Sequence, residues 1–284
     1  MTNTPAFDLD AYLRRIGLSG PVAPTLDILK AIQERHPASI AFENLDSLTG
    51  RVPSLDIADV QRKLVAGQRG GYCFEQNLLL RHALVAIGFR VSGLGARVIW
   101  NTPEDPIPPR SHMLLRVDLE DGTYTADVGF GGMTPTAPMR LDMEADQETP
   151  HGTYRLRPSH DVYRLEALVG DVWTPLYIFD LTEHFASDYG VANWHVATHP
   201  DSLFATTLVC ARTDKGKRYA LRDNELSIHH TAGPSEHHHL TSPDALCDVL
   251  ENTFRLNLAD LSGLDARIAG IFADAATALP IPHR

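Results

Sequence analysis

The stretch Arg69-Gly70-Gly71-Tyr72-Cys73-Phe74-Glu75-Gln76-Asn77 places a cysteine after a flexible Gly-Gly turn and before the mostly apolar run 78–87. This pattern predicts a helix that begins at Cys73 and ends before Gly88. Unpaired N–H groups at a helix start carry partial positive charge, which favours a thiolate over a thiol. Because the thiolate is the reactive form of cysteine, Cys73 is the candidate nucleophile.

The region before Cys73 has the apolar spacing of short helices. Asp8 is a plausible N-cap for the first helix, and Pro37 is expected to stop the second. Together with the helix that begins at Cys73, these segments predict a helical bundle over residues 1–88. The expected upstream helices cover residues 8–17, 25–35 and 56–65.

The region after Gly88 is rich in Val, Ile, Leu and Thr and is interrupted by turn residues. Asp121-Gly122 is expected to form a hairpin turn. This repetition of short strand-forming segments and turn residues predicts an antiparallel β-barrel or a strongly curved sheet over residues 89–181. The six expected strands are 90–100, 112–119, 124–128, 154–157, 161–168 and 172–178.

The last third of the chain mixes helical and strand patterns. Residues 182–204 are interpreted as a connector, helical over 182–195, and residues 205–284 as an α/β unit. The fold class is therefore α+β. Within the last unit, strands are expected at 205–211, 218–221 and 225–229, and helices at 243–253 and 264–275.

Composition and charge exclude several classes of protein. The net charge of −11 argues against nucleic-acid or anionic-membrane partners, which need clustered Lys and Arg. No run approaches the roughly 18 apolar residues that span a bilayer, and residues 1–5 do not resemble a signal peptide. The three cysteines are far apart in sequence, which fits a reducing compartment, so we expect a cytoplasmic protein.

Two further residues could activate Cys73. His112 opens an apolar strand, and Asp127 lies at the end of the next one. Cys, His and Asp are the parts of an activated-nucleophile triad, in which the carboxylate would orient the imidazole. A simple hairpin register does not bring His112 opposite Asp127, so their contact needs curved strands or an intervening element. Alternatively, His112 is structural and Asp127 is a turn former.

These segments resemble motifs of the arylamine N-acetyltransferase family. The similar stretches are residues 69–75, 111–115 and 126–132, with weaker matches at 41–46 and 193–200. They occur in family order and span about residues 8 to 275. The resemblance implies three domains: an N-terminal helical bundle, a central antiparallel β-barrel and a C-terminal α/β lid. It also implies a core like that of cysteine proteases, with Cys73, His112 and Asp127 as the catalytic triad.

The resemblance further implies a two-step reaction. Acetyl-CoA, as co-substrate, would acetylate Cys73 and release CoA. An arylamine, arylhydrazine or arylhydroxylamine would then take the acetyl group. No permanently bound cofactor is implied, and a homodimer is compatible with the family. The histidines at 229, 230 and 237–239 lack the spacing of a metal site, so no metal is expected.

Other residues acquire roles only through the resemblance. Arg69 is expected to pair with Glu43 as structural support. Ala41 and Leu78 stand where family members often have Pro and Gly, and Leu78 bears on the amine preference rather than on the chemistry. The substrate-binding residues would be Phe42, Val98, Phe130 and Phe204, and the CoA-binding loop would contain Gly129, Gly131 and Gly132.

Three other functions stay open from the residues alone. The same triad could pass its acyl group to water or to a protein amine, as in a hydrolase or a transglutaminase-like enzyme. A family relative could use an acyl donor longer than acetyl. A non-catalytic protein could use the cleft to hold a CoA thioester or an aromatic ligand, in which case Cys73 would not react.

Overall fold

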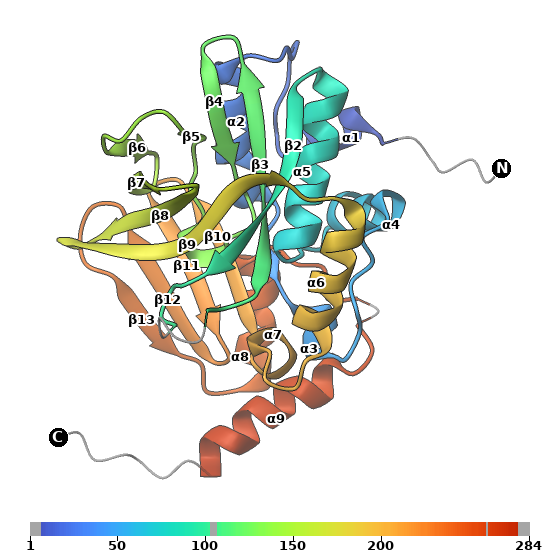
Figure 1. Ribbon diagram of the computed structural model, residues 1–284. Helices are drawn as coiled ribbons and strands as arrows, with labels where there is room; N and C mark the ends of the chain where they lie inside the picture. The colour runs from blue at the N-terminus through green and yellow to red at the C-terminus, as the bar shows by residue number, and fades with distance from the viewer. Residues whose placement is uncertain (1–6, 103–106, 260, 278–284) are drawn as a thin grey trace.

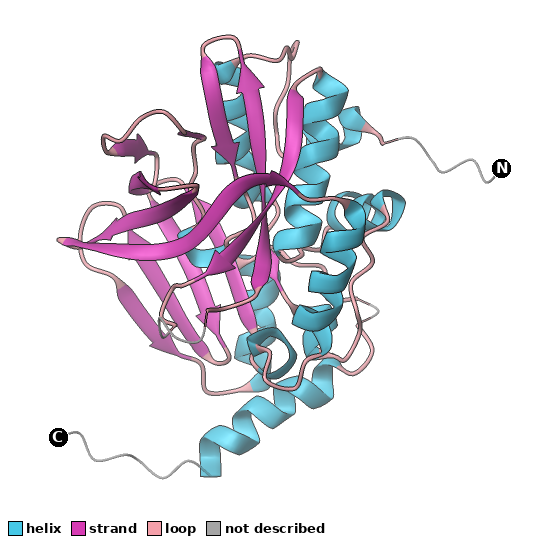
Figure 2. Ribbon diagram, in the orientation of Figure 1, coloured by secondary structure: helices cyan, strands magenta, loops and turns pink. Residues whose placement is uncertain are grey.

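The computed structural model describes residues 7–102, 107–259 and 261–277, with side chains to residue 273. Helices pack against and between two antiparallel sheets (Figures 1 and 2). No helix in this described part is long and apolar enough to cross a membrane. Residues 1–5, which bear on the signal peptide, lie outside it.

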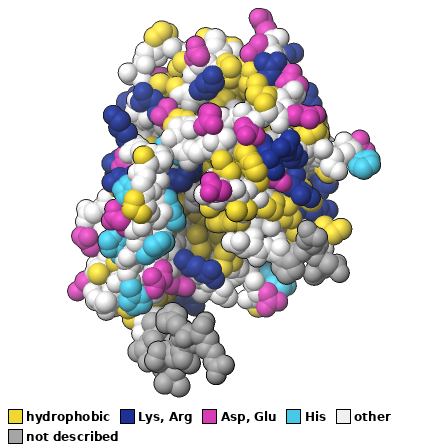
Figure 3. All heavy atoms as spheres, turned by 90° about the vertical axis from the view of Figure 1, so that its left-hand side faces the viewer, with side chains coloured by type: hydrophobic (Ala, Val, Ile, Leu, Met, Phe, Trp, Pro, Cys, Tyr) yellow, Lys and Arg dark blue, Asp and Glu magenta, His cyan; other side chains and the backbone are white. Residues whose placement is uncertain are grey.

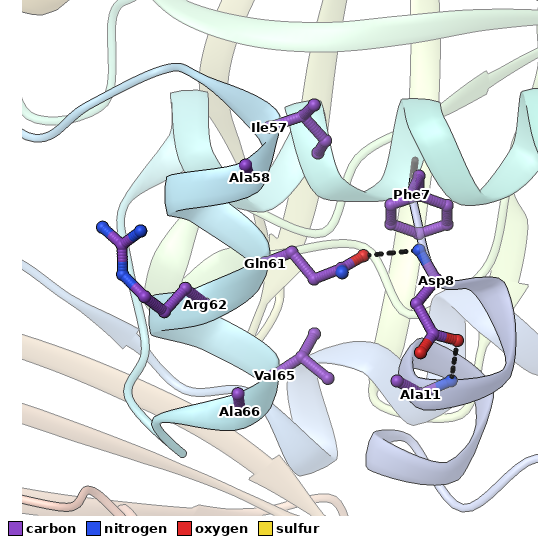
Figure 4. A pocket seen from close by; sticks show the side chains of 9 residues that line it. All are labelled: Phe7, Asp8, Ala11, Ile57, Ala58, Gln61, Arg62, Val65 and Ala66. Carbon is purple, nitrogen blue, oxygen red and sulfur yellow. Dashed lines mark hydrogen bonds between the residues drawn. The ribbon is translucent and has the colours of Figure 1, made fainter. Parts of the chain in front are cut away.

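The N-terminal region is helical, as predicted. The Asp8 carboxylate caps α1 by accepting from the Ala11 N–H at 2.9 Å, and the Asp8 N–H donates to Gln61 of α4 (Figure 4). The second helix does not stop at Pro37, because its last turn is held by the buried packing of His36 and Pro37. The elements are α1 (Leu9–Arg15), α2 (Leu26–Ser39), α3 (Leu45–Leu48), α4 (Ile57–Gln61), the π-helical turn η1 (Arg62–Ala66) and α5 (Cys73–Ile87).

Helix α5 has the predicted bounds. Tyr72 is its extended N-cap, and the Glu75 carboxylate accepts the Tyr72 N–H at 3.2 Å. Gly88 ends the helix with a φ of +105°, a conformation that glycine adopts without a steric penalty. Cys73 therefore occupies the first position of a well-terminated helix.

A curved sheet of eight antiparallel strands follows α5. Its order is β5-β4-β3-β2-β9-β8-β7-β6. The Gln147 side chain joins the two edges, because its Oε1 accepts from Arg140 N (2.8 Å) and its Nε2 donates to Arg140 O (3.0 Å). This bridge makes the sheet nearly a barrel. The strands are β2 (Arg90–Val98), β3 (Arg110–Leu119), β4 (Gly122–Ala126), β5 (Met139–Arg140), β6 (Gln147–Thr149), β7 (Gly152–Ser159), β8 (Val162–Val169) and β9 (Val172–Glu183).

The structure corrects two details of this region. Leu119 pairs with Gly122, so Glu120 and Asp121 form the β3–β4 turn instead of the expected Asp121-Gly122 pair. Strand β9 continues to Glu183, where the connector was expected to be helical already. Pairing of Glu183 with Leu94 of β2 keeps this end of the chain extended.

The second sheet has the order β1-β10-β11-β12-β13. The strand expected over 205–211 starts only at Val209, because residues 203–206 form a helix. The short strands β1, β5, β6 and β13 were not predicted. The remaining elements are β1 (Phe42–Glu43), the 3-10 helix η2 (Gly131–Met133), α6 (Ala186–Thr198), α7 (Leu203–Thr206), β10 (Val209–Asp214), β11 (Lys217–Arg222), β12 (Glu225–His230), β13 (Glu236–His239), α8 (Pro243–Asp248), the π-helical turn η3 (Val249–Thr253) and α9 (Leu264–Thr277).

The buried clusters link distant parts of the chain. One cluster joins the N-terminal helices to β3 and β4, and another fills the inside of the curved sheet. A third joins Ala41, Leu45 and Leu48 to β10, β11, α8 and α9. Residues of the predicted helical bundle (1–88) thus pack in the core of the predicted α/β unit (205–284). The division at residues 88, 181 and 204 stays a prediction.

Candidate active site

The three residues of the expected triad come from different elements and lie in the interior. Cys73 begins α5, His112 is near the start of β3, and Asp127 directly follows β4. Only 2 to 3% of the surface of each residue is exposed. The Cys73 Sγ lies 3.7 Å from the carbonyl oxygen of Ser111, the neighbour of His112. A thiol, an imidazole and a carboxylate thus occupy one buried cluster.

His112 and Asp127 form a charged pair. The distance from His112 Nε2 to Asp127 Oδ2 is 2.7 Å, which leaves Nδ1 for the Cys73 thiol. Burial acts to lower the pKa of His112. Asp127 raises it by more, and Cys73 raises it as well, so the pKa of His112 is about 10. Burial acts to raise the pKa of Asp127, whereas the charge and hydrogen bond of His112, together with hydrogen bonds from Asn77 and Gly129, hold it below its usual value. At neutral pH the pair is an imidazolium and a carboxylate.

The pair forms beyond the end of the β3–β4 hairpin. Backbone pairing stops at Leu115 and Ala126, so strand register does not bring His112 opposite Asp127. Asn77 of α5 lies between the diverging strand ends. The intervening element that the sequence required is therefore one side chain of the helix that carries the nucleophile.

Asn77 uses its whole amide group in this bridge. Its Nδ2 donates to Met113 O at 2.7 Å and to Asp127 Oδ1 at 2.9 Å. Its Oδ1 accepts from Val128 N at 3.1 Å. Because Asn77 lies one helical turn after Cys73, the helix, both strand ends and the carboxylate are held in one arrangement.

Two more donors complete the shell around the carboxylate of Asp127. The Tyr177 hydroxyl donates to Oδ2 at 3.1 Å, and Gly129 N donates to Oδ1 at 2.9 Å. With His112 and Asn77, each oxygen accepts two hydrogen bonds. Such a shell stabilises the ionised form of a buried carboxylate. Sequence reasoning missed both Asn77 and Tyr177. The position of Asn77 four residues after Cys73 was a usable signal, but no local pattern marks Tyr177.

A chain of buried hydrogen bonds from Tyr12 through His36 and Gln76 reaches the turn before Cys73. Gln76 Nε2 donates to Ala41 O (2.8 Å) and Gly71 O (3.1 Å), so its Oε1 must accept from His36 Nε2 (2.6 Å). His36 Nδ1 then accepts from the Tyr12 hydroxyl at 2.8 Å. Burial lowers the pKa of His36 to about 4, so this imidazole is neutral and its tautomer is defined by Gln76.

Arg69 and Glu43, named above as a supporting pair, contact each other directly. Arg69 Nε and Nη2 both donate to Glu43 Oε1, at 3.0 and 2.7 Å. Glu43 lies in β1 and Arg69 starts the turn that leads to Cys73. The pair thus connects the turn to the edge of the second sheet.

The aromatic residues expected to bind substrate fall into two groups. Phe130 lies edge-on to His112 with ring centroids 5.2 Å apart, and it also contacts Tyr177. Phe42 and Phe204 pack together at 5.7 Å, and Phe204 also contacts the Tyr72 ring. Val98 ends β2. Among the described ring contacts, Phe130 is therefore the one of these residues that contacts the imidazole of the triad.

The three glycines expected at a CoA loop have different surroundings. A Cβ added to Gly129 would lie 2.8 Å from Cys73 Cα. Gly131 has a φ of +79°, and a Cβ added to it would lie 3.7 Å from the Phe42 ring; a Cβ added to Gly132 would lie 3.8 Å from the Ala220 Cβ. Gly129 thus permits a close approach of two backbones, whereas Gly131 permits a left-handed turn.

A cavity of about 680 Å³ reaches the start of β3. Its walls come from α6 and from the strand ends near the triad, and its volume suits a small-molecule ligand. The residues that line it are Phe74, Gly95, Pro109, Arg110, Ser111, His112, His184, Asp188, Tyr189, Val191, Ala192, Trp194 and His195.

A histidine-rich hairpin lies away from the triad. Strands β12 and β13 carry His229, His230 and residues 237–239, and histidines gather on the face shown in Figure 3. Their side chains contact Ser, Glu and Asn side chains, such as Glu236 with His230 at 2.7 Å, and the His229 and His237 rings contact each other. Within the described part of the chain, no three His, Cys, Asp or Glu residues form a group that could hold a metal ion.

Comparison with known proteins defines the class of enzyme. A family model described as N-acetyltransferase matches residues 25–262. The arylamine N-acetyltransferase of Mycobacterium tuberculosis is 41% identical over 276 residues, covering 94% of this chain and 97% of that protein. The corresponding protein of Mycolicibacterium smegmatis is 42% identical over 273 residues, covering 94% and 98%. The chain is therefore an acetyltransferase.

Solved structures agree with the sequence comparison. The Mycobacterium marinum arylamine N-acetyltransferase in complex with CoA has a TM-score of 0.89 and 41% identity, covering 93% of this chain and 99% of that one. The Salmonella typhimurium enzyme has a TM-score of 0.88 and 36% identity, covering 96% and 99%. The chain belongs to the arylamine N-acetyltransferase family.

Proposed function

We propose that the protein transfers an acetyl group from acetyl-CoA to Cys73 and then to the nitrogen of an aromatic amine, hydrazine or hydroxylamine. The observation that carries this proposal is the buried His112–Asp127 pair beside a cysteine at a helix start. An imidazolium and a helix N-terminus both favour the thiolate that such a reaction needs.

The first step forms a thioester. The Cys73 thiolate attacks the acetyl carbonyl, the bond from that carbon to the CoA sulfur breaks, and the CoA thiolate leaves. His112 donates its proton to the departing sulfur and becomes neutral. Asp127 keeps the ring in the orientation that presents Nδ1 to the reacting sulfur.

The second step regenerates the enzyme. The acceptor nitrogen attacks the thioester carbonyl, and neutral His112 accepts a proton from that nitrogen. The bond to Cys73 sulfur breaks, and the thiolate and imidazolium are restored. In this scheme Phe130 would contact the acceptor ring, and Phe42, Val98 and Phe204 would lie further along the acceptor site. The loop that contains Gly129, Gly131 and Gly132 would bind CoA.

The names of relatives support the donor and acceptor classes. The M. marinum relative was solved with CoA. A Salmonella typhimurium relative, 37% identical over 268 residues, is named as both an arylamine N-acetyltransferase and an N-hydroxyarylamine O-acetyltransferase. Amines and hydroxylamines are both nucleophiles that the same thioester could acylate.

Intact-protein mass spectrometry after mixing with acetyl-CoA tests the proposal. We expect one added acetyl group that maps to Cys73 and disappears when aniline or phenylhydrazine is supplied. Cys73→Ala should stay unmodified, while Cys247→Ala should behave as the wild type, since Cys247 lies outside the site. Loss of the adduct without any acceptor would indicate a hydrolase instead.

A longer acyl donor is the second candidate. A Gibberella moniliformis relative named N-malonyltransferase is 32% identical over 219 residues, covering 66% of this chain. If acetyl-CoA gives no adduct but malonyl-CoA modifies Cys73, the acetyl assignment is wrong and the cysteine chemistry remains. If neither modifies a Cys73 that iodoacetamide still alkylates, transfer from CoA thioesters is ruled out.

A further inference from the structure

Lys63 lies inside the protein and contacts three carboxylates. Its side chain is 17% exposed and belongs to the π-helical turn η1. The Nζ is 2.6 Å from Asp46 Oδ2, 2.8 Å from Glu75 Oε1 and 3.9 Å from Glu43 Oε1. Nothing in the proposed reaction uses this lysine, and a buried cation of this kind needs an explanation.

Glu75 connects Lys63 to the turn that carries the nucleophile. While Oε1 contacts Lys63, Oε2 accepts the N–H of Tyr72 at 3.2 Å. A Cβ added to Gly71 would lie 2.7 Å from Oε2, so the carboxylate fits closely against the Gly71–Tyr72 peptide. The next residue is Cys73. A shift of this carboxylate would therefore move the first turn of α5.

The two arginines of this cluster contact Glu43 and Asp46. Arg69 contacts Glu43 at 2.7 Å and Asp46 at 3.7 Å, and Arg51 contacts Asp46 at 3.1 Å. Among the described ion pairs, Lys63 is the cation that contacts Glu75. Burial has the largest effect on the ionisation of Glu75 and favours the neutral form, as do Glu43 and Asp46, whereas Lys63 favours the charged form.

The ionisation of Glu75 is finely balanced. Burial raises the pKa of Glu75 to about 7, Lys63 acts to lower it, and the charges of Glu43 and Asp46 raise it. Removing Lys63 would raise the pKa further and leave Glu75 protonated at neutral pH. A protonated carboxyl is a weaker acceptor for the Tyr72 N–H than a carboxylate.

We propose that Lys63 is a positioning residue for the nucleophile: its ammonium keeps Glu75 ionised, and the Glu75 carboxylate holds the Tyr72 N–H and thereby the Cys73 turn. Lys63 acts through Glu75 and touches neither substrate nor the reacting atoms. The inference concerns the reactivity of Cys73, so it builds on the nucleophile of the proposed function but not on the identity of the acyl donor.

The test is the rate of Cys73 alkylation by iodoacetamide as a function of pH. For Lys63→Met we expect a rate about fivefold below wild type near pH 7, which approaches the wild-type rate as Glu75 ionises at higher pH. A rise of about one unit from a pKa of about 7 lowers the ionised fraction of Glu75 at pH 7 by about this factor. Lys63→Arg should keep the wild-type profile. The matched control is Arg62→Met, which removes the neighbouring cation, whose side chain is 73% exposed.

A double variant separates positioning from loss of structure. In Lys63→Met/Glu75→Gln the neutral amide oxygen can still accept the Tyr72 N–H, so the added pH dependence should disappear. A Lys63→Met profile that is parallel to wild type at every pH, or a double variant that keeps the added pH dependence, would overturn the proposal. If Lys63→Met fails to fold, Glu75→Gln alone carries the test: its alkylation profile should lose the dependence on Glu75 ionisation that the wild type shows near pH 7, and a profile identical to wild type would overturn the proposal.

The outcome is independent of acetyl transfer. Alkylation requires no acetyl-CoA, so failure of the proposed function appears as a Cys73 that alkylates but is never acetylated. Failure of the role assigned to Lys63 appears as an alkylation profile of Lys63→Met that is parallel to wild type at every pH, whatever the donor is.

Discussion

Gly129 and Cys73 lie with their backbones in contact: a Cβ on Gly129 would stand 2.8 Å from Cys73 Cα and 3.1 Å from its carbonyl oxygen. The same Cβ would stand 2.8 Å from Asn77 Nδ2. The loop after Asp127 is thus pressed onto the helix that carries the nucleophile, and this contact fixes the distance between the thiol and the His112–Asp127 pair.

We predict that Gly129→Ala separates the two backbones. We expect it to lower the free energy of unfolding by about 1–3 kcal/mol, the usual cost of overpacking, and to slow acetylation of Cys73. Gly270→Ala in α9 is the matched control, because its added Cβ would have no atom within 4 Å. Thermal unfolding and thioester formation measure both effects. Equal acetylation rates in the two variants would contradict the prediction.

Asp127→Asn should remove the charge that orients His112 while keeping the shape of the side chain. The imidazole would lose its ionic partner and its fixed orientation, so we expect turnover to fall by about 10²–10⁴-fold, the range of general acid–base catalysis. Alkylation of Cys73 at neutral pH should slow as well. The measurements are steady-state turnover and iodoacetamide kinetics. Unchanged alkylation would argue that the imidazolium does not stabilise the thiolate.

The His112–Asp127 pair should also give stability a defined pH dependence. The pKa of His112 rises from 6.5 to about 10 on folding, so its contribution is complete below pH 6.5 and is lost as pH rises through 10. The pKa of Asp127 falls below 3.8, so its contribution is present above that pH and is lost in acid. The difference in Tm between wild type and Asp127→Asn should therefore be largest at intermediate pH. A difference that is constant from pH 4 to 10 would exclude this pair as its source.

Asn77→Ala should loosen the bridge between α5 and the two strand ends. Three hydrogen bonds are lost and Asp127 Oδ1 keeps Gly129 N as a donor. We expect a loss of about 1–3 kcal/mol in unfolding free energy, the cost of leaving buried polar groups unpaired, together with slower turnover. The control is Asn252→Ala, whose exposed amide contacts only Asp248 among the described interactions. An Asn77→Ala variant as active as this control would show that the bridge is dispensable.

Local patterns predicted α5 well and left parts of the second sheet unpredicted. The Gly-Gly turn, the apolar run and Gly88 define the bounds of α5 by local backbone preferences. Strand β1 has only Phe42 and Glu43, and its pairing with Ala211 and Cys210 of β10 joins residues about 170 positions apart. No periodicity in two residues can indicate such a partner. Similarly, the end of the second helix at Ser39 depended on packing around Pro37.

Local sequence defines which chemical groups are present and where the helix of the nucleophile begins. The order of residues around Cys73, His112 and Asp127 is a local property, and so are the turn and cap preferences that place the thiol at a helix start. How these groups meet depends on packing in three dimensions. The strand register ends before Asp127, and the carboxylate is held beside His112 because Asn77 of α5 and Tyr177 of β9 approach it from distant elements, while Gly129 of the same loop adds a local donor. Such convergence depends on packing between distant segments, which local sequence patterns do not encode.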